Sequence, residues 1–246
     1  MKSLILMIQF LTRIPLPIEI EAETKDFEKG VIYFPVVGML IGILLFGLTK
    51  VFLGYIDTLT LAVGLVFFEV LLTGGLHLDG LADSFDGLFS YRDRERMLEI
   101  MKDSRIGSNG VLVLIFTLLF KTVLMNQILL NNLLGAILIM PVISRGMTVF
   151  ASRISNYARE NGMGNFFIGK VNNIQLAFGM GLTLLWMLLF SPNSLWMLII
   201  ALVTTWLWCR VCKNKVGGMT GDTLGANTEL QEVLTLLLFV LGLRFF

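Results

Sequence analysis

Residues 31–54 read VIYFPVVGMLIGILLFGLTKVFLG and carry a single charged side chain, Lys50. Because a bilayer core about 30 Å thick needs roughly 20 apolar residues in a helix, this stretch is long enough to cross a membrane. Six more apolar blocks follow, at about 58–78, 108–126, 132–151, 174–190, 194–212 and 232–246, the last of them short. The sequence therefore predicts an all-α, polytopic membrane bundle with about seven transmembrane helices.

The composition excludes several other classes of protein. Of the 246 residues, 56% are hydrophobic and 15% charged, whereas soluble domains have about 45–50% and about 25%. The net charge of +1 gives no reason to expect a nucleic-acid partner. Cys209 and Cys212 lie in an apolar block without a second cysteine pair, which favours packed helix residues over a zinc or redox site. With no internal repeat, we expect one integral membrane domain over 1–246.

The basic residues predict the orientation of the bundle. Most of the 19 Lys and Arg residues lie before the first span or in the loops after the second, fourth and sixth spans. By the positive-inside rule, the N-terminus and every large loop face the cytoplasm, as in a multi-pass protein of the cell (plasma) membrane. Residues 1–17 predict an interfacial helix ended by Pro15 and Pro17, within an interfacial segment 1–30 that precedes the bundle 31–246. The acidic stretch 19–28 predicts a solvated surface loop.

Charged residues inside a membrane protein usually serve function, and here they gather in residues 69–87, EVLLTGGLHLDGLADSFDG. Asp79, Asp83 and Asp86 are spaced i, i+4, i+7, so they share one face if the helix of the second span continues through them. Glu69 then falls near the same face, deeper in the membrane. Carboxylates stacked in this way repel one another, and a hard divalent cation bound through their oxygens would stabilise them.

Two questions stay open in this segment. The acids could instead form a solvated stripe that pairs with Arg92, Arg94 and Arg96. His77, the only histidine, could be a metal ligand, a proton acceptor, a phosphate contact or merely a hydrogen-bonded structural residue.

Two polar segments on the same side of the membrane resemble anion sites. Residues 102–110, KDSRIGSNG, place Asp103 and Arg105 at the start of the third span, where free backbone N–H groups attract an anion or simply receive an N-cap. Residues 217–229, GGMTGDTLGANTE, contain Thr220, Gly221, Asp222 and Asn227 in a glycine-rich run that could approach a phosphate closely, or be only a flexible loop. In the second run, Asp222 and Glu229 could add metal ligands.

Arg145 lies about two turns inside the fourth span and cannot stay unpaired in hydrocarbon, so we expect it to point inward to a carboxylate or a bound phosphate. Carboxylate-held cations, glycine-rich loops and inward arginines together suit phosphoryl transfer, in which a carboxylate or a histidine accepts a proton from an attacking hydroxyl. The candidates for that proton transfer are His77, Asp83 and Asp86.

Four segments resemble the cobalamin synthase family, the adenosylcobinamide-GDP ribazoletransferases. They are E-x4-G-x2-H-x-D-G-x-A-D-x2-D-G at 69–87, FLTRIP at 10–15 with FPVVG at 34–38, MKDSRIG at 101–107, and GGMTGDTLGAN at 217–227. The resemblance implies a membrane enzyme that joins adenosylcobinamide-GDP to α-ribazole or its 5′-phosphate, releases GMP and uses Mg²⁺. It makes Glu69, Asp79, Asp83 and Asp86 candidate metal ligands and His77 the histidine of the motif. Its partners would be these small molecules and the lipid bilayer, and a homo-oligomer is left open.

Two other functions compete with this interpretation. Asp83-x2-Asp86-Gly87 matches the start of the CDP-alcohol phosphotransferase motif, but Ser90 and Tyr91 stand where that motif has Ala and Arg. A cation- or proton-coupled transporter could use Glu69 and the acids as an ion path. Transporters of that kind often contain two related halves with broken helices, and this sequence shows no repeat.

Overall fold

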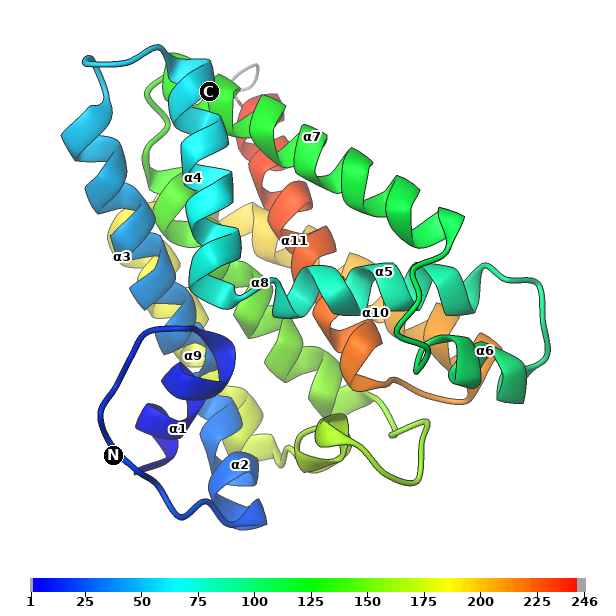
Figure 1. Cartoon of the computed structure of the whole chain (residues 1–246). Coiled ribbons are helices and arrows are strands. Elements are labelled where there is room, and N and C mark those ends of the chain that lie inside the picture. Colours follow the sequence, from blue (N-terminus) through cyan, green and yellow to red (C-terminus); the bar gives the residue numbers. More distant parts are fainter. Residues whose placement is uncertain (1, 243–246) are drawn as a thin grey trace.

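The computed structural model describes residues 2–242 and confirms an all-α membrane bundle (Figure 1). Six of the described helices are long and apolar enough to cross a bilayer, and α4 with α5 would make a seventh crossing if counted as one broken span. The helices are α1 (Lys2–Leu11), α2 (Thr24–Gly30), α3 (Phe34–Phe52), α4 (Thr58–Thr73), α5 (Leu76–Leu88), α6 (Arg94–Ile100), α7 (Ser108–Leu130), α8 (Gly135–Ile154), α9 (Asn173–Phe190), α10 (Leu195–Val216) and α11 (Gly221–Gly242).

Helix α8 is the centre of the bundle. Of the apolar stretch of α8, 89% is buried inside the bundle, whereas only 17% of the apolar stretch of α9 is buried. Glycines let α3 pack directly on α8: a Cβ atom on Gly38 would collide with the carbonyl oxygen of Pro141, and one on Gly42 with that of Leu138. Small residues at such crossings are typical of helices packed in a membrane, where van der Waals contact replaces the hydrophobic effect between helices.

Helices α7, α9 and α10 form much of the outer surface. Large apolar side chains stand out from them, for example Phe116, Leu189 and Ile199, which are 56%, 60% and 67% exposed. A soluble protein rarely exposes so much contiguous apolar surface, so these faces are suited to contact lipid. Multiple membrane crossings are thus supported by length, composition and the distribution of apolar surface.

The second predicted span, 58–78, ends early. Gly74 and Gly75 both adopt left-handed backbone, with φ of 65° and 69°, a conformation that glycine adopts without strain. They end α4 and start α5, which turns 89° away from it (Figure 1). The expectation that the helix of the second span continues through the acids is therefore wrong. Asp79, Asp83 and Asp86 do lie on a helix, α5, but Glu69 lies on a different one.

Three other boundaries differ from the sequence predictions. The last span was predicted over 232–246 after a polar connection at 217–229, but α11 starts at Gly221 and absorbs most of that connection. Residues 243–246 of the predicted span lie outside the described residues. The predicted surface loop 19–28 contains the start of α2. The predicted N-terminal helix is confirmed as α1, although it ends at Leu11, before either proline.

The segments rich in Lys and Arg lie at one end of the bundle. Helices α1 and α2, the connection 155–172 and the turn 217–220 gather there, and the turn 53–57 lies at the opposite end (Figure 1). This arrangement follows from the alternating direction of consecutive spans.

Candidate functional site

The two-glycine turn before α5 places the first polar residues of the site. Because α5 starts directly after Gly75, His77 and Asp79 lie in its first turn, next to the end of α4. Gly80 faces the start of α11, where a Cβ atom on it would lie 2.8 Å from the carbonyl oxygen of Asp222. The close approach that glycine allows here brings the acids of α5 beside Asp222.

The start of α11 is fixed by a reciprocal pair of threonines. The Thr220 N–H donates to the Thr223 hydroxyl at 2.8 Å, and the Thr223 N–H donates to the Thr220 hydroxyl at 3.2 Å. Caps of this kind satisfy N–H groups that the helix itself leaves free. The cap sets Gly221 and Asp222 in the first turn of α11, where the positive end of the helix dipole stabilises a carboxylate.

An extended segment after α8 supplies the third wall. Ala158 N–H donates to Met219 O, and Met219 N–H donates to Asn156 O, both at 2.9 Å. This short parallel pairing directs Arg159 to Asp222, with Nη2 2.7 Å from Oδ2. In the sequence, Arg159 is only one of the basic residues that predict the orientation, so its place in this site was not predicted.

These elements enclose a cavity of about 230 Å³, which we call the acid cavity. Its polar lining consists of His77, Asp79, Thr148, Tyr157, Arg159, Asp222 and Thr228. Phe10 of α1, Phe34 of α3 and Phe167 close it on the apolar side. Ligand sites usually measure about 300–1,000 Å³, so the acid cavity is smaller than a typical site for a whole small molecule.

The acid cavity carries more negative than positive charge. Asp79 and Asp222 line it, Asp83 lies within electrostatic reach of both, and Arg159 is the cation that faces them. Among residues 2–242, no three His, Cys, Asp or Glu side chains converge into a ready-made metal site. Mg²⁺, however, is usually held by one or two carboxylates together with substrate phosphates and water. The hard-oxygen donors and their uncompensated charge therefore fit such a cation.

Asp86 makes a different contact. Its Oδ2 accepts the Gly107 N–H at 2.7 Å and its Oδ1 accepts the Gly110 N–H at 2.8 Å. The carboxylate thus caps the start of α7 from the end of α5. Asp86 therefore occupies the anion site predicted in the segment 102–110. It does not line the acid cavity.

Glu69 and Arg145 belong to a group that we call the buried ion cluster: Glu69, Lys121, Arg145, Glu229 and Glu232. Lys121 Nζ lies 3.0 Å from Glu69, 3.2 Å from Glu229 and 2.5 Å from Glu232. Arg145 pairs with Glu232. The expectation that Arg145 meets a carboxylate is confirmed. Lys121 was not predicted as part of this group, although a lysine inside an apolar span needs a partner for the same reason as Arg145.

His77 lies between the acid cavity and the buried ion cluster. It is 7% exposed, lines the cavity, and is within electrostatic reach of Arg145, Lys121 and Glu232. Its Nδ1 has no hydrogen-bond partner among the described residues. A buried, unpartnered ring nitrogen is costly to the fold, which favours a function for it in binding or proton transfer.

The remaining predicted site residues do not line the acid cavity, although the Thr220 hydroxyl donates to Asp222 Oδ2 at 3.4 Å. Asp103 and Arg105 pair with each other at 2.6 Å on an exposed turn, where hydrogen bonds from the guanidinium lower the pKa of Asp103 to about 2. Thr220 serves as the cap of α11. Asn227 is fully buried, has no hydrogen bond to its amide among the described residues, and lines a separate hollow between α10 and α11.

If the acids of α5 formed a solvated stripe, they would pair with Arg92, Arg94 and Arg96. The described residues show none of these ion pairs. Arg94 donates to the carbonyl oxygen of Val216, and Arg96 pairs with Glu99 at 2.8 Å. Within the described part of the chain, Arg92 has no ion pair. The acids of α5 face α11 and α7 instead.

Comparison with known proteins covers the entire bundle. The family model described as cobalamin-5-phosphate synthase matches residues 3–240. A protein of Thermoanaerobacter pseudethanolicus named adenosylcobinamide-GDP ribazoletransferase is 41% identical over 242 residues, 97% of each chain. Proteins of the same name from Clostridioides difficile and Clostridium tetani are 39% and 38% identical, over all of both chains in the first case and over 97% and 96% in the second. No solved structure matches the chain.

Proposed function

The chain belongs to the cobalamin-5-phosphate synthase family, and we propose that the acid cavity is where it carries out the reaction for which its relatives are named. In that reaction α-ribazole, or its 5′-phosphate, is joined to adenosylcobinamide-GDP and GMP is released. The observation that carries the proposal is that the match at residues 3–240 includes every element that lines the cavity. The CDP-alcohol phosphotransferase and transporter interpretations are not favoured.

The bonds exchanged define what the cavity must do. A ribose hydroxyl of the ribazole attacks the phosphorus nearer to cobinamide, a new P–O bond forms, and the P–O bond to GMP breaks. The hydroxyl proton needs an acceptor, and GMP leaves with the negative charge. We assign the acceptor to His77, which lines the cavity and whose Nδ1 has no hydrogen-bond partner among the described residues. Arg159, which pairs with Asp222, can also donate hydrogen bonds to phosphate oxygens.

We assign Mg²⁺ binding to Asp79 and Asp222, which line the acid cavity, in place of the wider set of candidates drawn from the sequence. Asp83 does not line the cavity but adds negative charge close to both. A bound Mg²⁺ would neutralise charge on the pyrophosphate and on the departing GMP. Glu69 is engaged by Lys121 and Asp86 by the start of α7, so neither carboxylate is free for the metal in this structure. The three aspartates require a counter-charge that Arg159 alone does not supply.

We further propose that the acid cavity opens to the cytoplasm. The positive-inside rule assigns the end of the bundle that holds the basic segments to that side. The cavity is built from elements of this end, including α1, the segment 155–167 and the start of α11. Phe10, Phe34 and Phe167 give the cavity an apolar wall, which suits an amphipathic substrate near the lipid surface.

The test uses purified protein in detergent with Mg²⁺, adenosylcobinamide-GDP and α-ribazole, and measures released GMP. Asp79→Asn and Asp222→Asn should each lower turnover by roughly 100-fold or more, because a neutral amide binds a divalent cation poorly. Both should also raise the Mg²⁺ concentration needed for half-maximal rate. Asp57→Asn is the matched control, since Asp57 caps α4 at the opposite end and Asn caps equally well.

The outcomes separate the two parts of the proposal. Absence of GMP release from the unmodified protein would reject the transfer reaction itself. Turnover with an unchanged Mg²⁺ requirement in both Asn variants would keep the reaction but remove the acid cavity as the metal site. His77→Gln should lower the maximal rate more than it weakens substrate binding, and the reverse result would make His77 a substrate contact.

A further inference from the structure

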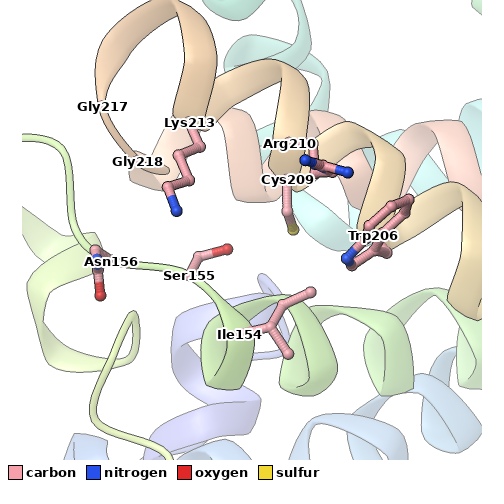
Figure 2. A pocket seen from close by; sticks show the side chains of 9 residues that line it. All are labelled: Ile154, Ser155, Asn156, Trp206, Cys209, Arg210, Lys213, Gly217 and Gly218. Atoms are coloured by element: carbon pink, nitrogen blue, oxygen red, sulfur yellow. The ribbon is translucent and has the colours of Figure 1, made fainter.

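A second and larger pocket lies between the carboxyl ends of α8 and α10. Nine residues enclose about 460 Å³ there, including Ser155, Trp206, Arg210, Lys213 and Gly218 (Figure 2). We call it the α8–α10 pocket. The extended segment after α8 separates it from the acid cavity: Ser155 and Asn156 line the first, and Tyr157 and Arg159 line the second. None of its lining residues also lines the acid cavity.

The α8–α10 pocket is positively charged. Arg210 and Lys213 are three residues apart on α10 and so lie on the same face of that helix. Neither forms an ion pair with any described residue, and the nine lining residues include no Asp or Glu. Figure 2 shows the Lys213 ammonium extending across the pocket toward the segment that holds Ser155 and Asn156. Two cations face a hollow that contains no counter-charge of the protein.

Ser155 gives independent evidence for a ligand. Ser155 lines the pocket and is only 9% exposed, and its Oγ has no nitrogen or oxygen hydrogen-bond partner in the described part of the chain, with the Cys209 thiol as its neighbour. An unsatisfied buried hydroxyl costs about 1–3 kcal/mol, so such groups usually have a partner that the protein alone does not provide. In Figure 2 the hydroxyl points toward the sulfur of Cys209 on α10.

The residues of the pocket favour an anion at the membrane surface. Trp206 is 43% exposed, and the Arg210 guanidinium lies 4.8 Å from the centre of its ring. Tryptophan with a nearby arginine at the end of a membrane helix is typical of the headgroup layer. Arginine, lysine and a hydroxyl together match the oxygens of a phosphate.

We propose that the α8–α10 pocket binds a phosphate group, presented by an anionic phospholipid headgroup or by a soluble phosphate. Binding depends on the two side-chain cations, because the carboxyl ends of α8 and α10 contribute negative potential and would repel an anion by themselves. Removal of both cations should therefore abolish binding instead of weakening it slightly. The proposal does not depend on the acid cavity.

The test compares the full-length protein with Arg210→Gln/Lys213→Gln. The matched control is Lys25→Gln/Arg92→Gln, which removes the same charge from exposed residues that line neither cavity. Retained lipid is measured by native mass spectrometry after exchange into phosphatidylglycerol or phosphatidylcholine. Equilibrium dialysis with inorganic phosphate measures the soluble source. A Ser155→Ala variant tests the hydroxyl without any change of charge.

The unmodified protein and the control should bind at least one phosphate probe with an affinity roughly tenfold or more above that of the double variant. Preference for phosphatidylglycerol with no binding of free phosphate identifies the lipid as the source. Binding of inorganic phosphate that the double variant loses identifies a soluble source. Equal binding in the double variant, or no binding of any probe by the unmodified protein, overturns the proposal.

Discussion

Replacement of Lys121 by methionine should destabilise the protein more than any other single removal of a lysine. Lys121 is 3% exposed and lies within 3.2 Å of three carboxylates, Glu69, Glu229 and Glu232. Without it, only Arg145 remains to balance them. Breaking a buried ion pair by removing one partner costs about 3–5 kcal/mol. For a chain of this size, each kcal/mol lowers the melting temperature by about 2–4 °C, so we expect a loss of roughly 6–20 °C.

A compensating substitution makes this prediction specific. Lys121 is the ion-pair partner of Glu69 within the described residues, and neither oxygen of Glu69 forms a hydrogen bond there. Neutralising both residues in Lys121→Met/Glu69→Gln restores the original balance of charge in the buried ion cluster. The double variant should therefore recover part of the loss, with a coupling of about 1–3 kcal/mol.

The measurement is the apparent melting temperature of purified protein in detergent, followed by intrinsic fluorescence and by loss of the monodisperse peak in size-exclusion chromatography. Lys50→Met is the control, because Lys50 also lies on an apolar helix but is exposed and rests over the Phe46 ring. Its melting temperature should change by no more than about 2–4 °C. A Lys121→Met protein that melts like the control, or a double variant less stable than Lys121→Met, would refute the role given to the cluster.

Three further predictions concern packing, capping and orientation. Gly38→Ala should destabilise the contact of α3 with α8 by about 1–3 kcal/mol, whereas Gly47→Ala, with open space around its Cβ, should be neutral or stabilising in the same melting assay. Asp86→Ala should cost about 0.5–2 kcal/mol and increase hydrogen exchange at the start of α7, because two N–H groups lose their acceptor; unchanged exchange would contradict this. Tyr55 and Tyr91 are 85% and 93% exposed, at opposite ends of the bundle. In intact cells an impermeant maleimide should label Tyr55→Cys and not Tyr91→Cys, and the opposite pattern would invert the topology.

The transmembrane spans could be predicted from the sequence because their signal is local: a run of apolar residues has to bury its backbone polar groups in a helix. The break in the second span was also readable. Two adjacent glycines, Gly74 and Gly75, in an otherwise apolar helix indicate left-handed backbone and a helix end. The continuous acidic face was preferred because its spacing was regular, and that preference was wrong about Glu69.

The start of α11 was misjudged for a different reason. Glycines lower helix propensity, so a run with four of them predicts a loop. In the structure Gly225 serves packing instead, since a Cβ atom on it would lie 3.3 Å from the His77 backbone. Whether a glycine provides flexibility or close approach depends on a neighbour almost 150 residues away in sequence, and no local pattern contains that information.

The members of the acid cavity illustrate the same limit. Asp79 and Asp222 were identified separately, each from its own motif, but nothing in the sequence paired Asp222 with Arg159. That pairing arises from the short parallel contact between residues 156–158 and 219. Long-range geometry of this kind has no periodicity to detect.

The walls of the acid cavity have a consequence for biosynthesis of the protein. Phe10 lies near one end of the chain and Thr228 near the other, yet both line the same small space. Spans enter the membrane in the order of their translation, so the cavity cannot close before α11 has been inserted. A nascent chain that stalls earlier leaves Arg159 without Asp222, its ion-pair partner, and leaves Gly80 of α5 without the backbone of α11 that packs on it. Such an unfinished chain should be inactive and recognisable to proteases that remove incomplete membrane proteins.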